Sequence, residues 1–412
     1  MADQNAPTEQ QLAEALTGAA PILLTQEPGA AAQPAPSPDD TWTLHGGTAW
    51  VYYGSGHRAL TRPVILADGF NSGPSNRDLL WEHLDSGAYA FLTELRHRGH
   101  DVVLLGFNER SASILDNAGT VSEAILRAIS ERQGDTPLAV GGLSMGGLVT
   151  RYALAKLEHD MVDHQTAVYF SYDSPHRGAW IPIALQAFAH YIRKLDSRFS
   201  DQMNSPAAQQ LLSQHIQEWE DTPTPSHQRA EFLDALRAVG DWPQRPRKIA
   251  VANGVGTGSG NGIEPGAKTF RGKGLAITGT ELYAQSDGDD QLVAQLRVVT
   301  LKKPQIRTSG LPDIDGAPGG TLEGFGILAD ALNALPRYAG MASEALIREH
   351  CFVPAVSAVD IRPIATDNEL YTPVNDLDPY DSGLDEFKLA SRNEPHTAIT
   401  EELGSWIIDR LA

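Results

Sequence analysis

The hydrophobic and polar positions from residue 41 onward alternate between two patterns. Short, largely apolar runs, such as residues 63–67 (PVILA) and 101–106 (DVVLLG), are typical of strands buried on both faces of a sheet. Between them, apolar residues recur at three- and four-residue spacing, as in residues 121–132, which predicts amphipathic helices. Strands separated by helices in this way predict an α/β fold, with a mostly parallel sheet flanked by helices.

Two long stretches interrupt this alternation. Residues 180–245 have mostly helical patterns, whereas residues 254–345 begin Gly-rich and then contain two β-like runs that predict a hairpin. Both follow a predicted strand, where lids that control access to a site are often inserted. The predicted organisation is a weakly ordered leader with one short helix (1–40), the first part of the core (41–179), a helical lid insertion (180–245), a core strand (246–253), a second insertion with a β-hairpin (254–345) and the last part of the core (346–412). In that last part, we expect the sheet to resume at residues 351–358 and 386–391.

Charge and cysteine content limit the partners and the compartment. The 412 residues include 32 basic and 52 acidic side chains, a formal charge of −20 at pH 7, so neither nucleic acid nor an anionic membrane surface is an expected partner. Cys351 is the single cysteine, which excludes an internal disulfide and a zinc site built from cysteines, and we expect it to be buried. The sequence shows no secretory signal and no apolar stretch near the ~20 residues of a membrane-spanning helix. These features predict a cytoplasmic protein with no integral membrane segment.

Two further patterns lack the spacing of the sites that they suggest. The Gly-rich residues 254–262 contain neither Gly-x-Gly-x-x-Gly nor the lysine of a P-loop, which favours a flexible hinge. The acidic residues within 287–290 and 313–316 do not have the full spacing of a calcium loop, which favours surface turns. We therefore expect no cofactor and no metal.

The segment Gly142-Leu143-Ser144-Met145-Gly146 carries the clearest chemical signal. It lies between a predicted strand at residues 137–141 and a predicted helix at residues 145–158, where a nucleophile elbow is expected. The glycines let neighbouring backbone pass close behind the serine, and the helix dipole favours negative charge near its hydroxyl. Ser144 is therefore the candidate nucleophile. The structural alternative is a serine that caps the helix in a Gly-rich turn.

A serine nucleophile also needs a base and an oxyanion hole. Among the 13 histidines, His396 is the best placed, because it lies between the last predicted strand and the terminal helix, where the chain order Ser…acid…His puts the base. The oxyanion hole takes one backbone donor from the residue after the nucleophile and one from the loop after the first core strand. Met145 and Phe70 are the candidates for these two donors.

Three segments together resemble the α/β-hydrolase superfamily, specifically its lipase and esterase branch. They are the loop Asp68-Gly69-Phe70, the elbow around Ser144 and the strand-end segment at residues 173–178 (DSPHRG). The resemblance covers residues 60–180 and 350–412, and it implies an α/β-hydrolase fold with serine-hydrolase chemistry. The two insertions match no family, and the motifs do not identify the substrate.

The acid that would hold His396 is ambiguous in the sequence. The resemblance implies an Asp-x-x-Val-Pro segment after the strand before the last, but the corresponding residues 350–354 read HCFVP, with histidine in place of the carboxylate. Asp173 ends the strand after the elbow, where some lipases carry the acid, and Asp360 follows the Val-Pro pair and would reach His396 through a longer loop. Both are candidates, and Asp381 is a third.

These residues predict a serine hydrolase that cleaves a carboxylic ester or thioester of an apolar acyl group through an acyl-enzyme on Ser144. The aromatic residues of the insertions, Trp180, Phe188 and Tyr191 among them, predict a covered apolar pocket for such a small-molecule substrate. An acyltransferase or a cyclase would use the same residues with an alcohol or amine in place of water. A non-catalytic binding module on the same scaffold is the third hypothesis.

Overall fold

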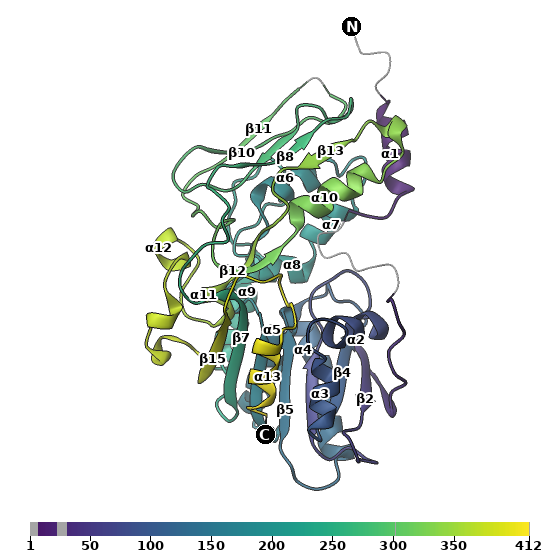
Figure 1. Ribbon diagram of the computed structural model, residues 1–412, viewed down its shortest axis with the longest axis vertical. Coiled ribbons are helices and arrows are strands. Elements are labelled where there is room, and N and C mark those ends of the chain that lie inside the picture. The colour runs from purple at the N-terminus through teal and green to yellow at the C-terminus, as the bar shows by residue number, and fades with distance from the viewer. Residues whose placement is uncertain (1–6, 23–30, 301, 412) are drawn as a thin grey trace.

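The computed structural model describes residues 7–22, 31–300 and 302–411. The molecule is elongated, with the main sheet and its helices in the lower half of Figure 1 and a second group of strands and helices above it. The main sheet has eight strands. In the order in which they lie side by side, they are β1 (Asp40–Leu44), β2 (Gly47–Tyr52), β4 (Asp101–Phe107), β3 (Pro63–Ala67), β5 (Leu138–Leu143), β6 (Thr166–Tyr172), β7 (Arg247–Val255) and β15 (Glu386–Ala390).

All neighbouring strands from β4 to β15 pair in parallel, whereas β1 and β2 form an antiparallel hairpin at one edge. The buried strands alternate their side chains between the two faces: in β3, Val64 and Leu66 join one hydrophobic core, and Ile65 and Ala67 join the other. This confirms the predicted mostly parallel sheet. Since parallel strands end at the same edge, residues that follow β3, β5 and β6 are brought together there.

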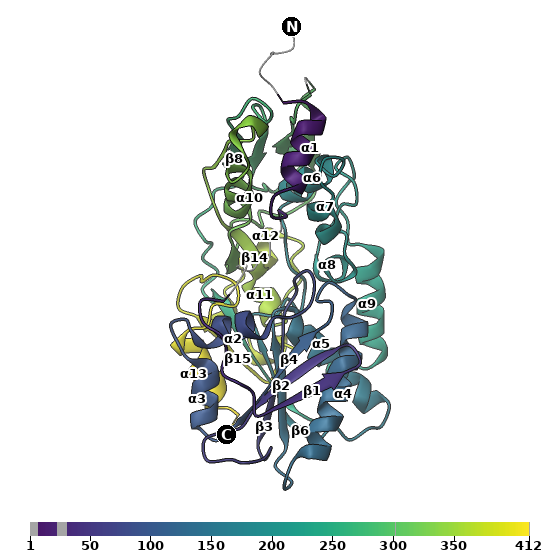
Figure 2. The ribbon, with the colours of Figure 1, turned by 90° about the vertical axis from the view of Figure 1, so that its right-hand side faces the viewer.

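Helices cover both faces of the sheet. Figure 2 shows α3 (Phe91–His97) and α13 (Glu401–Ile408) on one side, and α4 (Ile114–Glu131) and α9 (His227–Ala238) on the other. The helix α5 (Met145–His159) packs beside α4 and against β5. Residues 77–97 form two helices, α2 (Arg77–Asp85) and α3, with a break at residues 86–90.

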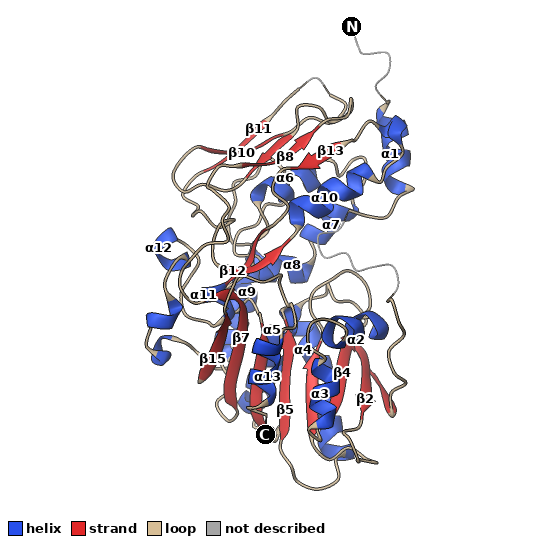
Figure 3. Cartoon of the chain, viewed as in Figure 1, coloured by secondary structure: helices blue, strands red, loops and turns tan. Residues whose placement is uncertain are grey.

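We call residues 183–211 and 268–345 the upper region. Its elements are α6 (Ile183–Tyr191), α7 (Arg198–Met203), α8 (Pro206–Leu211), β8 (Lys268–Gly272), β9 (Glu281–Tyr283), β10 (Gln291–Gln295), β11 (Gln305–Thr308), β12 (Gly319–Leu322), α10 (Gly324–Asn333), the 3-10 helix η1 (Arg337–Ala339) and β13 (Ser343–Ala345). Five of these strands form an antiparallel sheet in the order β11-β10-β9-β8-β13 (Figure 3). The expected hairpin is thus the β9–β10 part of a larger sheet.

One strand prediction near the C-terminus is wrong. The main sheet does not resume at residues 351–358: β14 (His350–Pro354) instead pairs antiparallel with β12 in a separate two-stranded sheet, and the short helix α11 (Ala355–Ala358) follows it. The apolar run is buried as expected, but it belongs to the junction between the sheet and the upper region. The remaining short elements are α12 (Asp367–Leu370), η2 (Val374–Asp376) and η3 (Pro379–Asp381).

The N-terminal helix packs on the upper region. The helix expected near residues 9–16 is α1 (Glu9–Thr17), which begins with a capping box at Thr8 and buries Leu12 and Leu16. The Arg198 guanidinium donates to the Leu16 carbonyl at 2.8 Å, which ties the end of α1 to α7. Residues 1–6 and 23–30 of the expected leader lie outside the described residues.

Two further expectations concern Cys351 and membrane spans. Cys351 is fully buried in β14, and burial raises the pKa of its thiol well above the usual value. Across the described ranges, none of the helices has the length and apolar character that crossing a bilayer requires.

Candidate active site

Ser144 occupies a tight turn between β5 and α5. Its backbone has φ 49° and ψ −122°, a conformation that side-chain-bearing residues rarely adopt. The turn requires glycine on either side: a Cβ on Gly142 would lie 2.3 Å from the carbonyl carbon of Gly146, and a Cβ on Gly146 would lie 2.3 Å from the carbonyl oxygen of Ala67. The sequence therefore places the Ser144 hydroxyl at the carboxyl edge of the sheet, at the N-terminus of α5.

His396 lies in the loop between β15 and α13, and its imidazole reaches Ser144. Its Nε2 is 2.8 Å from Ser144 Oγ, and its Nδ1 is 2.6 Å from Asp173 Oδ2. A carboxylate only accepts hydrogen bonds, so the neutral imidazole carries its proton on Nδ1 and accepts the Ser144 proton at Nε2. The backbone N–H of His396 donates to the Thr321 carbonyl at 2.7 Å, and this bond fixes the loop against β12.

Asp173 follows β6 and has no solvent exposure. Besides contacting the imidazole, its carboxylate accepts the Asn253 backbone N–H at 3.0 Å. The Asn253 side chain in turn donates to the Ala398 carbonyl at 2.9 Å, two residues after His396. Gly320 packs against the carboxylate so closely that a Cβ there would lie 2.1 Å from Oδ2. The orientation of Asp173 is thus set by three segments of chain.

The alternative acid, Asp360, is placed elsewhere. Its Oδ1 pairs with Arg177 Nε at 2.8 Å, and its Oδ2 accepts the Trp242 indole N–H at 2.9 Å. Asp381 lies exposed in the 3-10 helix Pro379–Asp381. Of the three candidate acids, the structure brings Asp173 to the imidazole.

The loop that follows β3 lies directly beside Ser144. A Cβ on Gly69 would be 3.3 Å from the Cβ of Ser144, so this loop has little room for a larger residue. Met145 is the first residue of α5, and the first N–H groups of a helix have no acceptor within that helix. Phe70 contributes to the wall of the pocket that contains Ser144. The two candidate oxyanion donors therefore belong to segments that lie next to Ser144.

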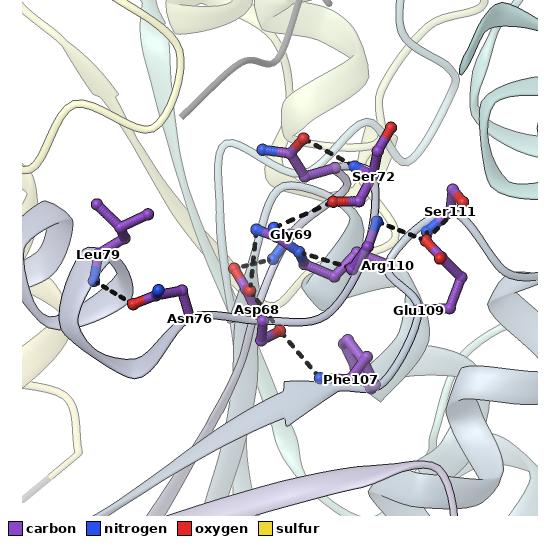
Figure 4. Close-up of polar contacts among 12 residues, drawn as sticks. Asp68, Gly69, Ser72, Asn76, Leu79, Phe107, Glu109, Arg110 and Ser111 are labelled. Carbon is purple, nitrogen blue, oxygen red and sulfur yellow. Dashed lines mark hydrogen bonds and ion pairs between the residues drawn. The ribbon is translucent and has the colours of Figure 1, made fainter. Parts of the chain in front are cut away.

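A buried polar network holds this loop in place (Figure 4). The Asp68 carboxylate accepts the Gly69 backbone N–H at 2.7 Å and the Ser75 hydroxyl at 2.6 Å, and it lies 3.5 Å from Arg110 Nη1. The Ser75 hydroxyl also accepts the Phe107 backbone N–H at 2.9 Å, which joins the loop to the end of β4.

Glu109 and Arg110 extend the network to the far end of the same loop. Glu109 accepts the Gly73 backbone N–H at 2.8 Å, and Arg110 donates to the Gly73 carbonyl at 3.3 Å. The sequence alone does not single out Asp68 or Arg110 as supports, because the contacts of Arg110 with Asp68 and Gly73 join segments that are far apart in the chain. The only available signal was that Asp68 directly follows a buried strand.

Ser144 and His396 open into a pocket of ≈ 440 Å³. Its lining includes the polar groups of Asp68, Asn71 and Arg110, and Glu82 and exposed His83 from α2. The remaining walls are mostly apolar side chains from α2, β5, β12, α10 and β14, namely Leu79, Leu80, Leu143, Leu322, Ile327 and Phe352. The Phe352 ring packs edge-on against the His396 imidazole with centroids 4.7 Å apart. Among the residues that the structure describes, no three His, Cys, Asp or Glu side chains form a group suited to a metal ion.

Two features of this chain are those of the α/β-hydrolase fold: the mostly parallel main sheet and the tight turn at Ser144 that follows strand β5. The chain therefore has the α/β-hydrolase fold. The sequence matches no family model and no curated protein.

Solved structures similar to this chain include three enzymes. The lipase of Bacillus licheniformis in its mature form is 12% identical over 50% of this chain and 73% of its own, with a TM-score of 0.33. The esterase of Pyrobaculum calidifontis is 12% identical over 59% of this chain and 71% of its own, with a TM-score of 0.34. Brefeldin A esterase, a bacterial homologue of human hormone-sensitive lipase, is 14% identical over 60% and 77%, with a TM-score of 0.31. The fold assignment itself rests on the sheet and the serine turn of this chain.

Proposed function

We propose that this protein is a serine hydrolase that cleaves a carboxylic ester or thioester of an apolar acyl group. The observation that carries the proposal is the continuous set of contacts from Ser144 Oγ to His396 Nε2 at 2.8 Å and from His396 Nδ1 to Asp173 Oδ2 at 2.6 Å. A hydroxyl, an imidazole and a buried carboxylate in this order are the groups that acyl transfer through a covalent intermediate requires.

In the first half of the proposed reaction, Ser144 Oγ attacks the carbonyl carbon of the substrate while His396 Nε2 takes the serine proton. The imidazolium that forms is stabilised by the Asp173 carboxylate, which stays ionised. The backbone amides of Met145 and Phe70 donate to the oxyanion. Collapse of the tetrahedral intermediate transfers the proton from His396 to the leaving alcohol or thiol and leaves the acyl group on Ser144.

In the second half, water enters and His396 takes one of its protons as the water oxygen attacks the acyl carbon. The intermediate then breaks the bond to Ser144 Oγ, which recovers its proton from His396, and the carboxylic acid leaves. The apolar walls of the pocket favour an apolar ester over a polar one, because they offer apolar groups of the substrate burial without unpaired polar atoms. An acyltransferase or cyclase would differ only in replacing the water by an alcohol or amine.

The test combines a fluorophosphonate probe with hydrolysis of p-nitrophenyl esters. We expect the wild-type protein to be labelled on Ser144, as located by mass spectrometry, and Ser144→Ala to lose labelling and about 10⁴–10⁶-fold in kcat. Ser122→Ala is the matched control, because this hydroxyl lies on α4 and bonds to the Ala118 carbonyl of its own helix. Folded wild-type protein that neither reacts with the probe nor cleaves any of the esters would overturn the proposal in favour of a binding module. Addition of an alcohol or amine with analysis of the products separates hydrolase from acyltransferase.

A further inference from the structure

A second, smaller cavity lies next to the Ser144 pocket. Phe70 and Phe352 line both spaces, so the two are adjacent at these aromatic side chains. The other walls come from Ala179 and Ile181, from α7 and α8, and from Leu212 directly after α8. The side chains that matter below are Ile181, Met203, Ala208 and Leu212. Every residue that lines this cavity has an apolar side chain.

We propose that this second cavity binds the acyl chain of the substrate, and that the substrate is therefore an ester or thioester of an unbranched acyl chain of short to medium length. The inference rests on the proposed serine-hydrolase function. To that function it adds the space that binds the acyl group and the residues that limit the length of the acyl chain. It also places the alcohol or thiol side of the ester in the open Ser144 pocket.

The two spaces differ in how they communicate with solvent. In the second cavity all lining residues apart from Phe70 are buried, with Ile181, Met203 and Leu212 only 2–3% exposed. The Ser144 pocket, in contrast, reaches exposed His83 and half-buried Leu79 on its rim. An alcohol or thiol has to leave before water can attack the acyl-enzyme, so it requires the open side. The acyl group stays bonded to Ser144 through both steps and can occupy the enclosed side.

The size of the second cavity selects the shape of the acyl chain. Its volume is ≈ 20 Å³, room for about one ordered water molecule, and its walls offer such a water no polar side chain. A chain that enters has to displace flexible side chains, and Met203 has the unbranched, adaptable side chain suited to this. A straight chain needs less displacement than a branched or aromatic group. Each methylene that becomes buried there is expected to raise kcat/KM about fourfold until the cavity is filled.

The test is the dependence of kcat/KM on acyl length, measured with the p-nitrophenyl esters of acetate, butyrate, octanoate and palmitate. For the wild-type protein we expect a rise of about 16-fold from acetate to butyrate, which differ by two methylenes, and a fall before palmitate. Ala208→Phe fills the cavity and should move the optimum to shorter chains, with octanoate losing at least tenfold relative to acetate. Met203→Ala enlarges the cavity and should move the optimum to longer chains.

Ile327→Phe is the matched control, because Ile327 lines the open pocket and not the second cavity. It should change kcat/KM for all four esters by a similar factor and leave the optimal chain length in place. The proposal is overturned if neither cavity variant moves the optimum, or if Ile327→Phe moves it as far as they do. Should Ala208→Phe fail to fold, Met203→Ala decides the question alone. These outcomes require Ser144-dependent hydrolysis by the wild-type protein, and its absence would instead count against the proposed function.

Discussion

The carboxyl edge of the main sheet and the junction between the two inserted segments each contain a fully buried carboxylate, and the partners of the two differ. At the edge of the sheet, Asp173 contacts the His396 imidazole, a group that can carry a positive charge. At the junction, Asp315 accepts the Trp180 indole N–H and the Gln285 backbone N–H, both at 2.7 Å and both neutral. The surface turn expected at residues 313–316 is therefore wrong, because Asp315 is fully buried by these contacts. Burial raises the pKa of Asp315 to about 6.

Burial alone therefore does not identify a catalytic carboxylate. Burying a charged carboxylate costs free energy unless a nearby group compensates the charge. Asp173 and Asp315 differ in the group that faces them. Asp173 faces a base whose protonation would generate the compensating charge during a reaction. Asp315 faces donors that cannot change their charge, so its contacts connect the two inserted segments without taking part in proton transfer. This contrast predicts opposite consequences for the same substitution at the two positions.

Asp173→Asn is expected to have the largest effect on activity. The asparagine keeps the size of the side chain, but its amide no longer holds the imidazole in the tautomer that accepts the Ser144 proton, and kcat should fall about 10³–10⁴-fold. The measurement is ester hydrolysis under saturating substrate. Asp360→Asn is the control: Asp360 is likewise buried, with a similar φ of 54° against 49°, but its partners are Arg177 and Trp242.

The control should retain most of its kcat while losing stability, because it breaks an ion pair whose carboxylate is buried. A larger loss of kcat in Asp360→Asn than in Asp173→Asn, with both proteins folded, would show that the wrong carboxylate has been assigned to His396.

Gly320→Ala should have a smaller effect on the same site. The added Cβ would lie 2.1 Å from Asp173 Oδ2 and 3.2 Å from the Cα of His396, so the carboxylate or the histidine loop has to move. A displacement of about 1 Å in such a site can cost about 10²-fold in rate, and we expect a loss of about 10–100-fold in kcat. Gly119→Ala is the control, because a Cβ there meets no atom within 4 Å and the position lies inside α4. If both variants hydrolyse esters at the wild-type rate, close packing around Asp173 does not control its position.

Much of the sheet was predictable from the sequence because its strands are short apolar runs between helical patterns. The strand predicted at residues 63–67 coincides with β3. The turn at Ser144 was predictable because the backbone there leaves no room for side chains at Gly142 and Gly146. The upper region was less predictable. Its strands β8 to β11 are three to five residues long and only partly buried, so their sequences carry neither a continuous apolar run nor a long alternation.

The acid partner of His396 could not be chosen from the sequence for a physical reason. Asp173 and Asp360 each follow a buried apolar segment, and both adopt positive φ, so local pattern does not separate them. What separates them is the long-range pairing of β6 with β7 and of Thr321 with the histidine loop, which aims the imidazole at Asp173. The wrong strand prediction at residues 351–358 has a related cause, since an apolar run indicates burial but not which sheet the strand joins.

Asp315→Asn is expected to have the smallest effect on activity and a pH-dependent effect on stability. The carboxyl group has a pKa of 3.8 when unperturbed and about 6 in the folded protein, so the folded state binds the proton more tightly. Below pH 3.8 both states are protonated, and between pH 3.8 and 6 the unfolded state loses its proton first. The contribution of Asp315 to the free energy of unfolding therefore falls as the pH rises through that window. Above the window, the protein bears the full cost of burying the charged carboxylate.

The neutral asparagine removes this cost and keeps an oxygen that can accept a hydrogen bond. We expect it to stabilise the protein at pH 8 by about 1–3 kcal/mol, and by clearly less at pH 5, where most folded wild-type molecules are protonated at Asp315. Thermal unfolding at the two pH values measures the difference, with the exposed Asp135→Asn as a control whose effect should be small and the same at both. If Asp315→Asn destabilises equally at pH 5 and pH 8, hydrogen bonding to the carboxylate outweighs its burial, and the contrast with Asp173 does not lie in the charge of the partners.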